Sequence, residues 1–190
     1  QIDTENPEAL EQALRLYNGK PLAYPVTQKN ADIVLPLIKK YGAAVVGLTL
    51  DKNGIPPKAE QRFAIAEKIL KRAMYYGIPK EDVFIDCLTL TASAEQEAVM
   101  ETLRALGRVK KELGLKTVLG VSNISFGLPN RPLINQNFLT MALTYGLDLP
   151  IINPNVDAMT GAVRAYKLLA NIDKNSFDFI AAYNSAAVQK

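Results

Sequence analysis

The stretch AAVVGLTL, residues 43–50, is almost wholly apolar and carries no charged side chain. A strand with one face in water alternates apolar and polar residues, whereas a strand of a parallel sheet is buried on both faces and is apolar throughout. The stretch therefore predicts an inner strand of a parallel sheet that is covered by helices.

Outward from this stretch, short apolar runs alternate with amphipathic helical segments, about six times along the chain. The first predicted strand ends at residues 3–4, and the others span residues 20–24, 43–50, 82–88, 116–121 and 149–152. The predicted helices span residues 7–18, 32–41, 58–76, 93–113, 132–145 and 157–170. Asn6 and Pro7 are expected to begin the first helix, and Ser93 with Gln96 forms a capping-box pattern for the fourth. Such alternation over short connections predicts an α/β domain with a parallel sheet, either a barrel or an open doubly wound sheet.

The composition of the 190 residues fits one globular domain and argues against several classes of function. The net charge of +3 is small and dispersed, so nucleic-acid binding is not expected. No apolar run approaches the length of a membrane-spanning helix, so no membrane association is expected, and the glycine patterns of nucleotide-binding loops are missing. The single cysteine, Cys87, excludes an internal disulfide and favours a reducing, cytoplasmic setting.

The chain contains no histidine, and this limits its chemistry. Ser-His-Asp and Cys-His mechanisms are excluded, as are most zinc sites, and we expect no metal site. Cys87 is either a nucleophile or a buried structural residue, and the lack of a candidate base favours the structural role. Carboxylates, amides and hydroxyls remain, and they suit the binding of a polar heterocycle better than the hydrolysis of an ester.

Polar residues gather where the predicted strands end. They are Asp3 and Thr4, Tyr24, Thr49 and Asp51, Asp86, Ser122 and Asn123, and Asn153. In both parallel architectures ligands bind at the carboxyl ends of the strands, so we expect these groups to converge on one polar mouth. The start of a loop also explains any one of them alone. Asp86 is harder to explain in this way, because it lies within the apolar run VFIDCL (residues 83–88) and a buried carboxylate needs a partner.

A longer motif adds a family to this interpretation. The stretch LGVSNISFGLPNRPLINQNFLTMALTYGLD (residues 119–148) closely resembles the pterin-binding methyltransferases that move a methyl group from methyltetrahydrofolate to a corrinoid protein, and the folate module of cobalamin-dependent methionine synthase. Four further stretches match in the same order, IDTENPEALEQAL (2–14), YGAAVVGLTLDKNGIP (41–56), YGIPKEDVFIDCLTL (76–90) and PIINP (150–154). The resemblance therefore covers the chain essentially from end to end.

The resemblance implies an eight-stranded TIM barrel with the folate in a polar cup at the carboxyl ends of the strands. Asp3 and Asp86 match the positions that hydrogen-bond the pterin ring, and Asn123 matches the catalytic position near N5, which carries the methyl group. The full set of expected pterin-binding residues is Asp3, Tyr24, Asp86, Ser122, Asn123, Arg131 and Asn153. The substrate would be 5-methyltetrahydrofolate or tetrahydrofolate, and the cobalamin would be carried by a partner corrinoid protein. We expect the protein to form a homodimer. We also expect it to act in the cytoplasm, in the one-carbon metabolism of an anaerobe.

Three departures from the family pattern accompany this resemblance. Tyr24 and Pro25 stand where the family often has Asn-Ser. Phe126 stands where acetogen enzymes have glutamine, and in this it is similar to methionine synthases. The family also begins with about two more strand–helix units, including an Asp-Val-Asn strand that contacts the pterin. Residues 1–190 are thus expected to form a single pterin-binding domain that holds about six of the eight βα units. Because Gln1 begins within a strand, we expect a fragment of a longer protein.

Two other functions stay open on the sequence. Dihydropteroate synthase shares the barrel and the pterin cup, but it needs a basic, phosphate-binding arrangement, whereas the loop SNISFG (residues 122–127) is of the methyltransferase type. A folate-binding subunit without turnover would also explain Tyr24 and the missing units.

Overall fold

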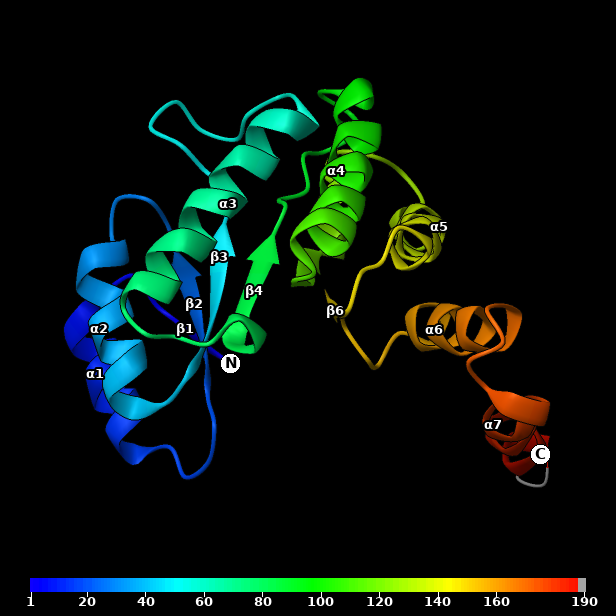
Figure 1. The fold of residues 1–190 in the computed structure, drawn as a ribbon. Coiled ribbons are helices and arrows are strands. Elements are labelled where there is room, and N and C mark those ends of the chain that lie inside the picture. The colour runs from blue at the N-terminus through cyan, green and yellow to red at the C-terminus, as the bar shows by residue number, and fades with distance from the viewer. Residues whose placement is uncertain (188–190) are drawn as a thin grey trace.

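The computed structural model describes residues 1–187, and their strands form one parallel sheet that curls into a half-barrel (Figure 1). The strands lie side by side in chain order. They are β1 (Ile2–Asp3), β2 (Leu22–Val26), β3 (Ala44–Leu48), β4 (Val83–Asp86), β5 (Lys116–Gly120) and β6 (Leu149–Ile151). Every neighbouring pair is parallel. Sequential order is the topology of a barrel wall, whereas an open doubly wound sheet reverses its strand order.

The helices follow one another around the outer face of the sheet, and α7 lies beyond α6 (Figure 1). They are α1 (Pro7–Leu16), α2 (Ala31–Tyr41), α3 (Ala59–Tyr75), α4 (Gln96–Arg108), α5 (Arg131–Thr144), α6 (Asp157–Leu169) and α7 (Phe177–Ala187). Short 3₁₀ turns are η1 (Lys80–Asp82), η3 (Val121–Ser125) and η4 (Lys174–Ser176), and η2 (Val109–Leu113) is one π-helical turn that continues α4. Six strands with intervening helices confirm the predicted α/β, partial-barrel class.

The helix starts show where local sequence signals succeed and where they fail. The Asn6 side chain accepts hydrogen bonds from the backbone N–H groups of Glu8 and Ala9, as its position before Pro7 predicts. The capping box predicted at Ser93 is wrong, because α4 begins at Gln96 without a side-chain cap. The Ser93 hydroxyl instead donates to the Phe126 carbonyl at 2.8 Å, so a tertiary contact replaces the local one.

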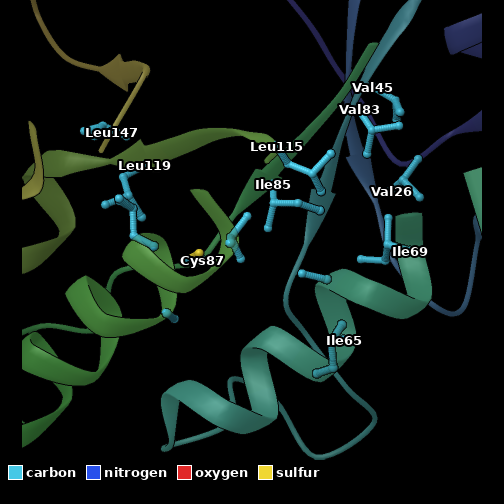
Figure 2. Close-up of a cluster of buried hydrophobic side chains, with 14 of the residues drawn as sticks. Val26, Val45, Ile65, Ile69, Val83, Ile85, Cys87, Leu115, Leu119 and Leu147 are labelled. Atoms are coloured by element: carbon cyan, nitrogen blue, oxygen red, sulfur yellow. The ribbon is translucent and has the colours of Figure 1, made fainter. Parts of the chain in front are cut away.

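The core lies between the sheet and the helices. Figure 2 shows Val45 of β3 and Val83 and Ile85 of β4 packed against Ile69 of α3. A Cβ atom on Gly47 would lie 2.6 Å from Cγ2 of Ile69, which is closer than real Cβ contacts come. Glycine in the middle of β3 therefore lets α3 lie directly against the strand.

Gly47→Ala is expected to lower the free energy of unfolding by about 1–3 kcal/mol, because the added methyl overpacks the contact with Ile69. Urea denaturation of the wild-type protein and the variant measures this change. Combining Gly47→Ala with Ile69→Ala, which removes the group that the new Cβ meets, is expected to cost less than the sum of the two single changes. Strictly additive costs would show that the two positions are not in contact.

Candidate functional site

The candidate site begins on the concave face of the sheet, which is turned away from the helices. Val83 and Ile85 of β4 point toward the core beside α3 (Figure 2). Because side chains alternate along a strand, Asp86 lies on the opposite, concave face. It ends β4 and is only 2% exposed.

The register places two more predicted site residues on this face. Ala23 pairs with Val45, whose side chain belongs to the core beside α3, so the next residue of β2, Tyr24, is on the concave face. Asp3 pairs with Tyr24 and shares that face. The prediction that Tyr24 ends its strand is wrong, since β2 continues to Val26. Tyr24 therefore presents its ring from within the sheet and not from a loop.

Two donors hold the Asp86 carboxylate. The backbone N–H of Leu88 donates to Oδ1 at 2.7 Å, and the Tyr24 hydroxyl reaches across β3 toward Oδ2 at 3.4 Å. Burial raises the pKa of Asp86 to about 6, and these two hydrogen bonds only partly oppose the rise. The expectation that this carboxylate needs a partner is confirmed, and the group changes charge close to neutral pH.

Tyr24 and Asp3 differ in their hydrogen bonding to the rest of the protein. Burial, together with the negative charges of Asp86 and Asp3, raises the pKa of Tyr24 well above its usual range, so its hydroxyl stays protonated and remains a donor. The Asp3 side chain is exposed and makes no hydrogen bond or ion pair with residues 1–187. Its oxygens are thus free to accept hydrogen bonds from a ligand.

The loop after β5 is the turn η3, which carries Ser122 and Asn123. Both residues are exposed, and within the described part of the chain the Asn123 carboxamide has no hydrogen-bond partner. A Cβ on Gly120 would lie 3.2 Å from Nδ2 of Asn123, so the glycine that ends β5 makes room for the carboxamide. Asn123 thus presents a free amide at the carboxyl end of the sheet.

Arg131 supports this turn. Its Nε donates to the Ser125 hydroxyl and its Nη2 to the Ser122 carbonyl, both at 2.9 Å. Its guanidinium lies 4.6 Å from the centre of the Phe126 ring. Two nitrogens of the Arg131 guanidinium therefore hold the turn η3 in its conformation.

Six of the seven predicted residues form two groups in the structure, and the seventh, Asn123, lies on η3 next to Ser122. Asp3, Tyr24 and Asp86 share the concave face, while Ser122, Arg131 and Asn153 line a hollow of about 210 Å³ beside η3. The loop after β4 joins the two groups, because the backbone N–H of Ala92 donates to the Ile124 carbonyl at 2.9 Å. The Asn153 side chain accepts from the Asn155 N–H and so orders its own loop.

Several other predicted strand-end groups prove structural. Thr49 donates its hydroxyl to the Asp86 carbonyl, and the Asp51 side chain accepts from the Asn53 N–H. Cys87 is fully buried, and burial raises the pKa of its thiol far above the usual range, which agrees with a structural role. A larger hollow of about 730 Å³ lies between α3 and α4 and contains none of the predicted site residues.

Sequence reasoning missed Arg62, a fully buried residue of α3. Its guanidinium donates to the backbone carbonyls of Cys87 and Leu88, which follow Asp86. An arginine in an amphipathic helix usually marks the solvated face, so no signal in the sequence identifies it as an interior residue.

Within residues 1–187 there is no cluster of three or more histidine, cysteine or acidic residues that would bind a metal ion. In the same part of the chain, no helix combines the length and apolarity needed to span a bilayer.

Asp86→Asn is expected to change how stability depends on pH. Because folding raises the pKa of this carboxyl from 3.8 to about 6, its contribution to stability is fully present below the lower value and is lost as the pH rises through the higher one. The neutral amide avoids this loss, so between about pH 4 and pH 7 the variant should gain about 3 kcal/mol relative to the wild-type protein. Denaturant unfolding across this range measures the difference, and parallel stability curves would contradict it.

Comparison with known proteins places this arrangement in a family. Residues 1–153 match the family of pterin-binding enzymes. Over 192 residues the chain is 26% identical to the methylcorrinoid:tetrahydrofolate methyltransferase of Eubacterium limosum, covering 98% of this chain and 71% of that protein. It is 32% identical to the methionine synthase of Mycobacterium leprae over 167 residues, which are 80% of this chain and 14% of that protein. The crystal structure of dihydropteroate synthase from Thermus thermophilus superposes with a TM-score of 0.66 at 20% identity, over 88% of this chain and 70% of that chain, and shows the shared fold. The chain belongs to the family of pterin-binding enzymes.

Proposed function

We propose that this chain carries most of the folate site of an enzyme that transfers a methyl group between 5-methyltetrahydrofolate and the cobalt of a corrinoid protein. The observation that carries the proposal is the unengaged pair of polar groups at the carboxyl ends of the strands, the Asp3 carboxylate and the Asn123 carboxamide. The Eubacterium limosum relative, which is named for this reaction and matches 98% of the chain, supports it.

The concave face suits the pterin ring. A pterin offers several N–H donors along one edge, and carboxylates accept such donors strongly. Asp86 is ionised above about pH 6 and is held on both oxygens, so it accepts from a fixed position. Asp3, on the same face, would accept from another part of the ring.

Asn123 is the residue that we assign to the transfer step. In that step the bond between N5 and the methyl carbon breaks, the methyl group passes to the corrinoid cobalt, which supplies the nucleophile, and N5 takes up a proton. The methyl group on a neutral tertiary amine is a poor electrophile unless N5 is protonated or hydrogen-bonded. A carboxamide that supports N5 more strongly in the transition state than in the bound substrate lowers the barrier.

The number of strands and the position of Asn123 indicate what the chain would assemble with. A TIM barrel has eight strands and this sheet has six, so we propose that residues 1–190 are one pterin-binding domain completed by about two further βα units. The corrinoid protein would approach the carboxyl ends of the strands, where Asn123 is exposed. A homodimer in the cytoplasm is part of the same proposal.

One observation favours a second candidate, a subunit that binds folate without transferring the methyl group. The Tyr24 hydroxyl is directed at Asp86 Oδ2 and competes there with a pterin donor. Binding without transfer would support this candidate. For a dihydropteroate synthase, the Arg131 guanidinium, which is occupied by η3, offers little to a pyrophosphate group.

Asn123→Ala is expected to reduce the rate of methyl transfer from methyltetrahydrofolate to cob(I)alamin by about 100-fold or more, because the transition state loses its hydrogen bond at N5. Folate affinity, measured by calorimetry, should fall much less. The assay uses the full-length protein and follows the absorbance of cob(I)alamin.

Asn137→Ala is the matched control for this experiment. Asn137 is exposed on α5, and its amide donates to the Leu133 carbonyl within the same helix. This change should leave transfer unaltered. Full activity of Asn123→Ala would refute the role of Asn123, and inactivity of the wild-type protein with intact folate binding would favour the binding subunit.

A further inference from the structure

Arg62 is buried in an unusual way for an arginine. None of its surface is exposed, and its guanidinium contacts no carboxylate of the residues that the structure describes. Its Nε donates to the Pro56 carbonyl at 2.7 Å, and its Nη1 donates to the Thr102 hydroxyl at 2.7 Å. Nη2 has no hydrogen-bond partner within residues 1–187. Burying a charge without an ion pair is costly, so the remaining contacts of this group need an explanation.

Those remaining contacts lie in the loop that follows Asp86. Nη1 of Arg62 donates to the carbonyl of Cys87 at 3.1 Å and to the carbonyl of Leu88 at 3.0 Å. These two carbonyls belong to the peptide planes on either side of the Leu88 Cα. One guanidinium nitrogen therefore restrains both backbone dihedral angles of Leu88.

Leu88 needs such a restraint. Its φ is +61°, in the left-handed region that a bulky side chain rarely adopts. Such a conformation persists only when the surrounding structure enforces it, and it is typical of functional sites.

The same peptide plane links Arg62 to Asp86. The carbonyl of Cys87 and the N–H of Leu88 lie on opposite sides of one planar peptide. Arg62 holds the carbonyl, and the N–H donates to Oδ1 of Asp86 at 2.7 Å. A charged donor on the carbonyl also polarises the peptide and strengthens its N–H as a donor.

We propose that Arg62 is a positioning residue. It holds the peptide between Cys87 and Leu88 in the orientation in which the Leu88 N–H donates to the Asp86 carboxylate and favours its charged form. This role rests on the proposed function only in that Asp86 receives the pterin. The titratable and charged groups around Asp86 are Tyr24 from β2, with Asp3 beyond it on β1, and Arg62 through the peptide. The neighbouring Cys87 thiol belongs to the core and interacts with Asp86 electrostatically.

The direct test is the titration of Asp86 itself, followed by ¹³C NMR of its side-chain carboxyl in the full-length protein. In the wild-type protein the midpoint should lie at about pH 6. Arg62→Ala should raise it by about one pH unit, the size expected for losing a hydrogen bond to a charged group. Arg62→Lys, which keeps the charge but has one nitrogen, should raise it less.

Arg72→Ala is the matched control. Arg72 also lies on α3, but it makes an exposed ion pair with Asp32, far along the helix from Arg62. This change should leave the Asp86 midpoint where it is. An equal rise in the control would mean that any loss of an α3 arginine perturbs Asp86, and it would overturn the proposal.

A rescue variant separates positioning from general loss of structure. Glycine adopts positive φ without a Cβ penalty, so Leu88→Gly added to Arg62→Ala should bring the midpoint part of the way back. If Arg62→Ala does not fold, Thr102→Val provides the test, because the Thr102 hydroxyl accepts from Nη1 at 2.7 Å and so helps to place the guanidinium. It should raise the midpoint by less than one pH unit, and an unchanged midpoint in a folded variant would overturn the proposal.

Folate binding, measured in parallel, distinguishes the failure of this inference from the failure of the proposed function. Arg62→Ala should weaken the binding of methyltetrahydrofolate by about tenfold at about pH 5, and by only about twofold at pH 7, through the lost ionisation of Asp86. If the wild-type protein binds no folate but the midpoints shift as expected, the proposed function fails and the role of Arg62 stands. If the wild-type protein transfers the methyl group and the Arg62 variants titrate as it does, the role of Arg62 fails alone.

Discussion

Burial of the Asp86 carboxylate is the constraint on which the surrounding structure depends. A charge at the end of an inner strand must be met by donors, and here the backbone supplies the nearer one through Leu88. The chain then turns into a left-handed conformation at Leu88, two residues after the end of the strand. Arg62 of α3 donates to the carbonyls on either side of the Leu88 Cα, and the helix is held against the sheet by its apolar face. The buried Asp86 carboxylate is thus linked to the conformation of the loop after β4, to the buried arginine of α3 and to the polarity of the concave face.

The turn η3 presents its polar group in a different way from the strand end at Asp86. Asn123 is left without protein partners in the described part of the chain, and its neighbours hold the turn in place. Arg131 binds the turn from α5, and Thr91 and Ser93 bind it from the loop after β4. The backbone that carries the free amide is therefore held from two sides, while the carboxamide itself is left for a ligand.

Much of the fold could be predicted from the residues, because apolar strands and amphipathic helices carry their periods in short windows. Asp86 stood out for the same reason, as a charge inside an apolar run. The failures share a cause in tertiary contact. Ser93 resembled a helix cap but bonds to a distant carbonyl, and Tyr24 was expected at a strand end but lies within β2. The helix α7 had no predicted counterpart. Arg62 could not be found in this way, because the residues that accept its hydrogen bonds come from other segments.

The close approach at Gly47 has a consequence beyond packing. Ile69, which the glycine admits, and Arg62 are seven residues apart on α3, about two helical turns, and so they lie along the same side of the helix. The side of α3 that approaches β3 closely at Gly47 is thus the side from which Arg62 donates to the loop after β4. A family member that fills the gap at this glycine would have to adjust the acid at the neighbouring strand end as well, so the two positions are expected to change together in evolution.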